Sequence, residues 1–452
     1  MNKALINDLI EKNELKVVEQ NLLYAYLQKK NLDFEKSPIL SKELSGFDPD
    51  TAIQLSISSL SIDIIKDLEQ NLELLIPKSD RKVNGAFFTP TYIVDFIVDE
   101  LKPKPDDKCL DPSCGCGAFL VGLVQYFHEK YRKPIRQIII ENIFGADILE
   151  YNVRRSKNIL AILALSHSEI ISDEDFNIYN HDSLKAKWQR RFQVIAGNPP
   201  YVKYQDLSDE NRSYLIQNWS TIENGTFNLY FAFFELGYKL LSSDGRLGYI
   251  TPNNYFTSLA GLSLRSFFQN KKCLSRIVDF SHRKVFDAQT YTAISFIDKE
   301  KNSSILFDKV KDSQSCQEFL KHANGSPNAI KNLSVKKWRL LKTDEQENIR
   351  IIESIGTPIK KLFNIAVGIA TLKDEVFFID SKVEENGELI KTTENGTFCI
   401  EKEITKPVYK ISQFKTQDEI LNNTLRVITP YKFTNGSAQP YSEDQLRSQF
   451  PL

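Results

Sequence analysis

The sequence of 452 residues lacks the features that would cross-link it, anchor it in a membrane or make it a polycation. Its six cysteines are scattered and form no CxxC pair, which argues against a zinc ribbon or a disulfide framework. No apolar run approaches the roughly 18 residues of a membrane span, and the amino terminus is too charged for a signal peptide. Lys+Arg total 58 and Asp+Glu total 59, which excludes a histone-like polycation. We therefore expect a cytoplasmic protein with reduced thiols and no membrane partner.

The composition that remains is typical of a globular protein, with 41% hydrophobic and 26% charged residues. At about 150 residues per domain, the length allows two to four domains. We predict an N-terminal helical segment over residues 1–80, a central domain over 81–325 and a C-terminal domain of mixed structure over 326–452. Residues 1–80 carry Leu and Ile at helical spacing and hold 14 acidic and nine basic residues. We expect them to form a packing or partner surface, because an acidic face binds phosphate poorly.

The central domain alternates short apolar runs with amphipathic stretches, which predicts an α/β fold with a parallel sheet. Two later runs, 293–298 and 304–307, lie close together in the sequence. They predict antiparallel strands at one edge of the sheet. The expected parallel strands lie at residues 108–110, 143–146, 194–196, 247–250 and 277–278.

The segment Asn198-Pro199-Pro200-Tyr201 follows the apolar run 194–196. Two prolines fix two backbone angles and remove two N–H donors, which predicts a stiff loop. Its place is the carboxyl end of a strand, where open α/β sheets bind ligands. The Asn198 side chain and the Pro199 carbonyl can act as fixed acceptors, and Tyr201 adds a flat face. This set suits a planar ring with an exocyclic NH2 group; the plainer alternative is a stiff loop beneath a helix.

A glycine turn in residues 109–119 joins an apolar strand to a helix. Gly115 and Gly117 allow the backbone to approach a ligand closely. Leu120 stands where the third glycine of a dinucleotide pattern would be, which argues against a pyrophosphate cradle. A nucleoside without phosphate fits better, and Asp111 can supply a carboxylate for an ammonium group. The Cys114/Cys116 pair, two residues apart in a glycine loop, has no third ligand, so we expect no metal site.

Two further acids end predicted strands. Asp147 follows the run 143–146, at the place where Rossmann-like folds bind ribose hydroxyls. The alternative for Asp147 is a helix N-cap. Asp182 ends the third strand and can accept a hydrogen bond from an adenine amino group, whereas we expect the neighbouring His181 to be structural.

Taken in order, these motifs resemble the gamma-group N6-adenine DNA methyltransferases of restriction–modification systems. The resemblance covers roughly residues 84–300 and resumes at 368–377, which looks like the start of that family's target-recognition domain. The matching segments are 88–90 (FTP), 111–119 (DPSCGCGAF), 145–147 (GAD), Asp182, 198–201 (NPPY), 228–235, 245–250 and 285–286.

The resemblance implies a Rossmann-like, S-adenosylmethionine-dependent methyltransferase sheet. It implies transfer of a methyl group to the N6 amino group of a flipped-out adenine in duplex DNA, without a metal. The residues that inherit S-adenosylmethionine binding are Phe88, Thr89, Asp111, Gly115, Gly117, Asp147, Ile148 and Asp182. The residues that inherit catalysis are Asn198, Pro199, Pro200 and Tyr201, with Tyr201 and Phe286 packing on the flipped base.

The substrate and the partners are left open by the sequence. Residues 265–342 hold 16 basic and seven acidic residues, which fits either a solvated surface or a stripe facing the phosphates of duplex DNA. NPPY also occurs in protein glutamine and RNA methyltransferases, and a non-catalytic recognition subunit is a third alternative. Only about 75 residues follow residue 377, fewer than a domain typically needs. We therefore expect a partial target-recognition domain, in a fragment, a split gene product or a subunit, and either a cognate restriction endonuclease or a missing C-terminal subunit as a partner.

Overall fold

A computed structural model describes residues 2–451, apart from residues 78, 81–84, 86–88, 223–226, 287–290, 312–313, 365–367, 370, 372, 383, 386, 394 and 435–436. The chain forms two compact units, Met1–Ser354 and Ile355–Leu452. No helix in the described part of the chain is long and apolar enough to cross a lipid bilayer.

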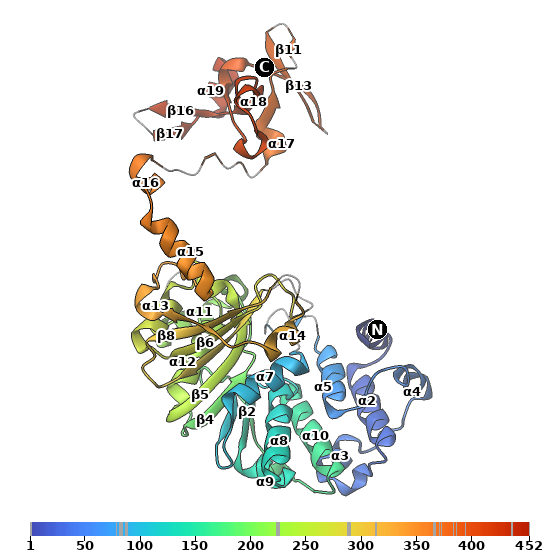
Figure 1. Cartoon of the computed structure of the whole chain (residues 1–452). Coiled ribbons are helices and arrows are strands. Elements are labelled where there is room, and N and C mark those ends of the chain that lie inside the picture. Colours follow the sequence, from blue (N-terminus) through green and yellow to red (C-terminus); the bar gives the residue numbers. More distant parts are fainter. Residues whose placement is uncertain are drawn as a thin grey trace. The chain divides into compact units, whose positions relative to one another are not determined.

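The first unit is built on a nine-stranded sheet of order β3-β2-β1-β4-β5-β7-β6-β8-β9 (Figure 1). Strands β3, β2, β1, β4 and β5 are parallel neighbours, and the 3-2-1-4-5 order is that of Rossmann-like sheets. The predicted α/β fold is therefore confirmed. The strands are β1 (Cys109–Asp111), β2 (Ile143–Asp147), β3 (Asn177–Asn180), β4 (Phe192–Gly197), β5 (Leu241–Pro252), β6 (Leu274–Asp279), β7 (Thr292–Asp298), β8 (Ser304–Lys309) and β9 (Ser326–Ala329).

The late strands differ from the prediction of an antiparallel pair at one edge. Strand β7 is antiparallel, but it lies inside the sheet, between β5 and β6. Strand β8 does not pair with β7; it runs parallel to β6 on the other side. Strand β9 pairs with β8 and forms the edge. Closeness in the sequence suggested a hairpin, whereas β7 fills the gap between β5 and β6, and the chain then crosses β6 before it forms β8.

Helices cover both faces of the sheet (Figure 1). Two hydrophobic clusters of buried side chains lie between the sheet and these helices. Helices α7, α8, α9 and α10 pack on one face, and α12 packs on the other. Both faces are buried, as parallel sheets require. The helices are α7 (Thr91–Leu101), α8 (Ala118–Tyr131), α9 (Ile135–Glu141), α10 (Glu150–Ser166), α11 (Asp209–Asn218), α12 (Tyr230–Leu240), α13 (Leu262–Lys271), α14 (Cys316–Lys321) and α15 (Thr343–Ser354).

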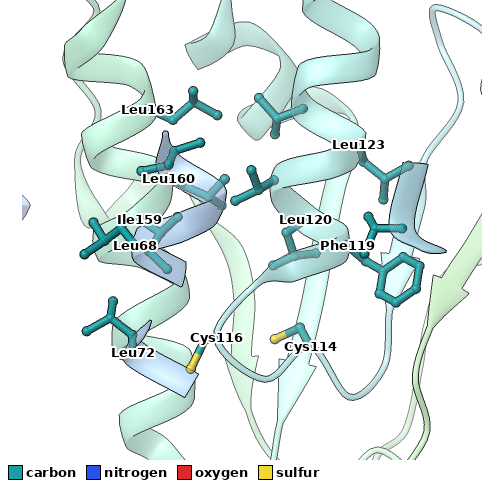
Figure 2. Close-up of a cluster of buried hydrophobic side chains, with 14 of the residues drawn as sticks. Leu68, Leu72, Cys114, Cys116, Phe119, Leu120, Leu123, Ile159, Leu160 and Leu163 are labelled. Carbon is teal, nitrogen blue, oxygen red and sulfur yellow. The ribbon is translucent and has the colours of Figure 1, made fainter. Parts of the chain in front are cut away.

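The predicted N-terminal helices are present, and they pack on α8 and α10 rather than standing apart. Figure 2 shows Leu68 and Leu72 of α5 in one hydrophobic cluster with Leu160 of α10 and Cys116. The helices are α1 (Asn2–Lys12), α2 (Leu15–Lys29), α3 (Pro38–Glu43), α4 (Thr51–Ile57) and α5 (Ile65–Leu74).

A buried ion pair joins these helices to the sheet domain. Arg155 of α10 donates two hydrogen bonds, of 2.9 and 2.8 Å, to the Glu19 carboxylate of α2, and both side chains are fully buried. Arg154 donates a third bond to Glu19, at 2.8 Å. Because a buried charge without its partner is costly, this pair ties the acidic segment to one position on α10. The acidic segment is thus a packing surface, as predicted.

The structural boundary lies after Ser354, although the sequence had suggested a boundary between residues 325 and 326. Residues beyond 325 still belong to the sheet domain, because β9 pairs with β8 and Trp338 is 2% exposed. The second unit contains α16 (Ile359–Leu362), α17 (Asp374–Phe377), α18 (Gln417–Leu421), α19 (Glu443–Gln449), β10 (Phe378–Asp380), β11 (Glu384–Glu385), β12 (Glu388–Thr393), β13 (Gly396–Ile400), β14 (Thr405–Pro407), β15 (Leu425–Ile428), β16 (Tyr431–Thr434) and β17 (Ser437–Pro440).

The ion pair gives a first prediction. Glu19→Ala leaves Arg155 charged and buried, so we expect the free energy of unfolding to fall by about 3–5 kcal/mol in urea titrations. Glu11→Ala, at an exposed site on α1, is the matched control. The double variant Glu19→Met, Arg155→Leu should lose less than Glu19→Ala, because it removes both charges together. A double variant that is less stable than the single one would contradict this account.

Candidate active site

A cavity of about 400 Å³ opens at the carboxyl ends of β1, β2 and β4. Its size is that of a small-molecule site. The helices and loops that enclose it all belong to the first unit. It brings together eight residues that the sequence analysis had singled out, namely Thr89, Asp111, Gly115, Asp147, Ile148, Asp182, Asn198 and Pro200.

Four other predicted residues, Gly117, Pro199, Tyr201 and Phe286, do not line this cavity. Phe88 lies outside the described residues. Pro199 is buried in the loop after β4, and Tyr201 and Phe286 lie together beside it. Gly117 begins α8 at φ +104°, and a Cβ there would lie 3.2 Å from the Ser156 Cβ. In the structure this glycine allows close packing of the turn on α10, and its contact with a cofactor stays a prediction.

The glycine turn after β1 is fixed to the end of β2 by backbone hydrogen bonds. The Cys114 N–H donates to the Ala146 carbonyl at 2.9 Å, and the Gly115 N–H donates to the Asp147 carboxylate at 2.9 Å. Gly115 has φ +53°, and a Cβ there would meet no atom within 4 Å. Its backbone therefore faces open space, which leaves room for a ligand to approach.

Asp147 serves the turn and the next helix at the same time. Besides the bond from Gly115, its carboxylate accepts bonds from the Leu149 N–H at 2.9 Å and from the Asn152 amide at 3.1 Å. Burial raises the pKa of this carboxyl. Asp147 is not the N-cap of α10, which is Leu149, although it accepts a bond from the N–H of that residue. Asp147 also lines the cavity, and its contact with a ribose stays a prediction.

Asp111 is almost completely buried, with 1% of its surface exposed. It accepts a hydrogen bond from the Ser113 N–H at 3.0 Å. Burial, helped by the nearby Asp147 charge, raises the pKa of Asp111 to about 8. A Cβ at Gly197 would lie 2.8 Å from Asp111 Oδ1, so glycine is required there for the carboxyl to fit. Asp111 thus lies directly against the end of β4, where the NPPY loop begins.

Two segments hold the NPPY loop in place. The Asn198 amide nitrogen donates to Thr89 Oγ1 at 3.1 Å, which orients the amide with its oxygen on the other side. The Tyr201 N–H donates to the Gly85 carbonyl at 3.3 Å. Gly85 has φ +59°, and a Cβ there would lie 2.5 Å from the Tyr201 nitrogen. The sequence analysis did not single out Gly85, whose role depends on this contact across the fold.

The aromatic residues of the prediction form a cluster beside the loop. The Tyr201 hydroxyl donates to the Ile250 carbonyl at 3.2 Å. Its ring lies edge-on to Phe286, with centroids 6.2 Å apart, and to Tyr230, with centroids 6.3 Å apart. Phe286 is 6% exposed, so it is part of the core in this structure. Its contact with a flipped base stays a prediction.

The remaining predicted residues lie on the β3 side of the cavity. Asp182 accepts from the Leu184 N–H at 3.0 Å and lies 3.8 Å from the Lys185 ammonium. Burial lowers the pKa of His181, whose ring stacks on Tyr179. Ile148 is 55% exposed at the cavity, which offers an apolar surface to a flat ring.

Several lining residues were missed by the sequence analysis, chiefly those of α5 and α11. Their apolar spacing only indicated helices, and nothing in the spacing shows which helix end faces the sheet. Within the described part of the chain, no three His, Cys, Asp or Glu side chains converge as metal ligands do. The described lining includes one lysine, Lys185, and six carboxyl groups, those of Glu69, Glu73, Asp111, Asp147, Asp182 and Asp206. This surplus of acids favours a cationic ligand and disfavours a phosphate.

Comparison with known proteins places the site in a restriction–modification context. Residues 141–286 match the model of the Eco57I restriction-modification methylase family. The chain is 26% identical over 450 residues to the type II restriction enzyme and methyltransferase RM.Eco57I of Escherichia coli, covering 83% of this chain and 44% of the relative. It is 25% identical over 351 residues to the type II methyltransferase M.BstVI of Geobacillus stearothermophilus, covering 68% of this chain and 62% of the relative. The predicted resemblance to restriction–modification methyltransferases is confirmed.

Solved structures support the fold. The chain aligns with a DrdV–DNA complex at a TM-score of 0.53 and 14% identity, over 73% of this chain and 40% of that one. It aligns with the type IIG restriction endonuclease BpuSI at a TM-score of 0.51 and 17% identity, over 74% of this chain and 43% of that one. The chain thus spans less than half the length of either structure.

Asp111 gives a prediction about pH. Its pKa is about 8 in the folded chain and about 4 when unfolded, so the folded state holds the proton more tightly. The stability that this proton supplies is full below pH 4 and is lost as pH rises towards 8. Asp111→Asn should remove this dependence, which amounts to about 4 kcal/mol between pH 5 and pH 8.5. Urea unfolding of both proteins between pH 5 and pH 8.5 measures it, and parallel curves would contradict the assignment.

Proposed function

We propose that this chain carries the methyltransferase of a restriction–modification enzyme. It transfers a methyl group from S-adenosylmethionine to the N6 amino group of an adenine in duplex DNA. One observation carries the proposal. Asp111, at the start of the glycine turn, and Asn198, in the NPPY loop, line the same cavity, and Gly197 lies against Asp111. The residues expected for the cofactor and those expected for the target amine are thereby neighbours.

The cavity suits S-adenosylmethionine in charge and in shape. This cofactor combines a nucleoside without phosphate, a sulfonium and an ammonium group, and it supplies an electrophilic methyl group when bound. The six carboxyl groups favour its cations. Asp147 would hold the ribose, Ile148 would cover the adenine and Asp182 would accept from the adenine amino group. The turn at Gly115 leaves room for the cofactor chain.

Asn198 and Pro199 would act on the target amine. An adenine amino nitrogen is a weak nucleophile, because its lone pair is delocalised into the ring. Acceptors at Asn198 Oδ1 and the Pro199 carbonyl bind its two N–H groups and favour a pyramidal nitrogen. They also stabilise the positive charge that develops on that nitrogen during transfer. The bond from the Asn198 amide to Thr89 fixes the amide before the substrate arrives, which lowers the cost of ordering it.

A paired adenine cannot reach this depth, so the base has to leave the helical stack, at a cost of a few kcal/mol. Stacking on an aromatic ring offsets roughly 1–3 kcal/mol per base. Tyr201 is anchored to Ile250, and Phe286 lies against it, so both can offer a ring only after a small rearrangement of this cluster. Such a rearrangement fits a pocket that forms when the base enters.

Only some of the basic side chains in residues 265–342 are placed to face DNA. Arg265 and Arg276 are structural, because Arg265 donates to the carbonyls of Val335 and Lys336 and Arg276 pairs with Asp308. The exposed side chains of this stretch include Lys271, Lys272, Lys321, Lys331, Lys336 and Lys337. These lysines are the ones we assign to phosphate contacts, which give position on DNA rather than sequence.

The second unit, Ile355–Leu452, is the segment we assign to target recognition. The chain spans 44% of the RM.Eco57I relative, which is named as both restriction enzyme and methyltransferase. We propose that nuclease and further recognition functions come from other polypeptide segments or subunits that act with this chain in the cytoplasm.

A methyl-transfer assay tests the proposed substrate. We expect labelled methyl groups from S-adenosylmethionine to enter duplex DNA at adenine N6. Labelling of RNA or of glutamine in protein, with none in DNA, would overturn the proposal and favour the NPPY alternatives named above.

Asn198→Ala tests the proposed contact with the amine. Methyl transfer should fall by at least about 100-fold, because the variant loses the Oδ1 acceptor that binds an N–H of the target amine in the transition state. Cofactor affinity, measured by calorimetry, should change little. Asn177→Ala, at the start of β3, is the matched control and should retain transfer. A variant that keeps its activity, or one that loses cofactor binding, would refute this role.

Phe286→Ala tests the proposed contact with an extruded base. Turnover on duplex DNA should fall more than cofactor affinity, because a stacking surface is removed. A 2-aminopurine at the target position should brighten when the wild-type chain binds. If thermal stability falls while turnover per folded molecule is unchanged, Phe286 is a core residue only.

A further inference from the structure

We propose that Glu69 of α5, with Glu73 one turn later, binds the ammonium group of the cofactor's amino-acid end. The inference rests on the proposed function and goes beyond it, because it gives the N-terminal helices a direct part in cofactor binding. From the sequence alone, Asp111 is the expected carboxylate for the ammonium, and residues 1–80 are expected to form a packing or partner surface.

Glu69 is placed as a ligand rather than as a surface acid. It is 4% exposed and lines the cavity. Its Oε1 atom has no hydrogen-bond partner within the part of the chain that the structure describes. A buried carboxyl oxygen without a partner costs free energy, and a cation delivered by a ligand can remove that cost.

The packing of α5 directs these carboxyls at the glycine turn. Leu68 and Leu72 lie on the face of α5 that enters the hydrophobic cluster with Cys116 (Figure 2). Glu69 and Glu73 each follow one of these leucines, so they share the adjacent face, four residues apart. The charges of both acids raise the pKa of the Cys116 thiol, after the larger effect of burial. Both carboxyls therefore lie near the turn, whose residues Cys114, Gly115 and Cys116 line the same cavity.

The nearby cation does not neutralise Glu69. Arg155 donates its bonds to Glu19 instead, at 2.8 and 2.9 Å. Burial and the charge of Glu73 raise the pKa of Glu69 well above its ordinary value. Asp111 differs from this pair, because it accepts from Ser113 and lies against Gly197, next to the NPPY loop. The ammonium group thus fits Glu69 and Glu73 better, and Asp111 is left to the end of the cavity where the methyl group is transferred.

Two ligands that differ in the ammonium group test the assignment. S-adenosylhomocysteine carries it, whereas 5′-methylthioadenosine keeps the nucleoside and the thioether and lacks the whole amino-acid end. Calorimetric titration with each ligand is made on the full chain and on Glu69→Gln and Glu73→Gln. Glu11→Gln, at an exposed site on α1, is the matched control.

We expect Glu69→Gln to weaken S-adenosylhomocysteine binding by about tenfold or more, and 5′-methylthioadenosine binding by less than about twofold. Glu73→Gln should show the same selectivity with a smaller loss, and it decides the question if Glu69→Gln does not fold. Equal losses for both ligands, or no loss for either, would overturn the assignment. If the wild-type chain binds neither ligand, the proposed function fails instead.

Discussion

The contact between Glu19 and Arg155 is the constraint on which the arrangement of the first unit depends. Both side chains are fully buried, and the contact joins residues 136 positions apart. A buried arginine is tolerated only when its charge is paired or its N–H groups are hydrogen-bonded, and here a carboxylate does both. This requirement fixes α2 on α10, and α5 packs on both of these helices. The face of α5 that meets the cavity is thereby set by a charge pair that does not itself line the cavity.

Two opposing effects act on the carboxyl groups of the cavity: burial favours their neutral forms, whereas hydrogen bonds and a cationic ligand favour their charged forms. Burial raises the pKa values of Asp111, Asp147 and Glu69, which favours their neutral forms. Asp147 offsets its burial by accepting three hydrogen bonds, so its charge also holds the turn and the start of α10. Asp111 accepts one bond from Ser113. A cationic ligand stabilises the charged forms, so ligand charge and site ionisation are coupled.

The sequence predicted the features that are local and ordered along the chain. The strands that end at Asp111, Asp147 and Gly197 were expected from short apolar runs, and their carboxyl ends meet at one edge because the strands are parallel and adjacent. The positions of Gly85 and Glu69 could not be predicted, because each depends on a contact across the fold. The pairing of β8 with β6 was missed for the same reason. The end of the first unit at Ser354 depends on β9 joining the sheet, which no local pattern indicates.

The 2.8 Å distance between Asp111 Oδ1 and the position of a Cβ at Gly197 has a mechanical consequence. Strands β1 and β4 are hydrogen-bonded neighbours, and their carboxyl ends lie side by side. A methyl group at residue 197 would press directly on the Asp111 carboxyl, so the backbone at 197 and the side chain at 111 compete for the same space. For the same reason, residue 197 stays restricted to glycine as long as residue 111 is a carboxylic acid, so these two positions constrain each other's substitutions.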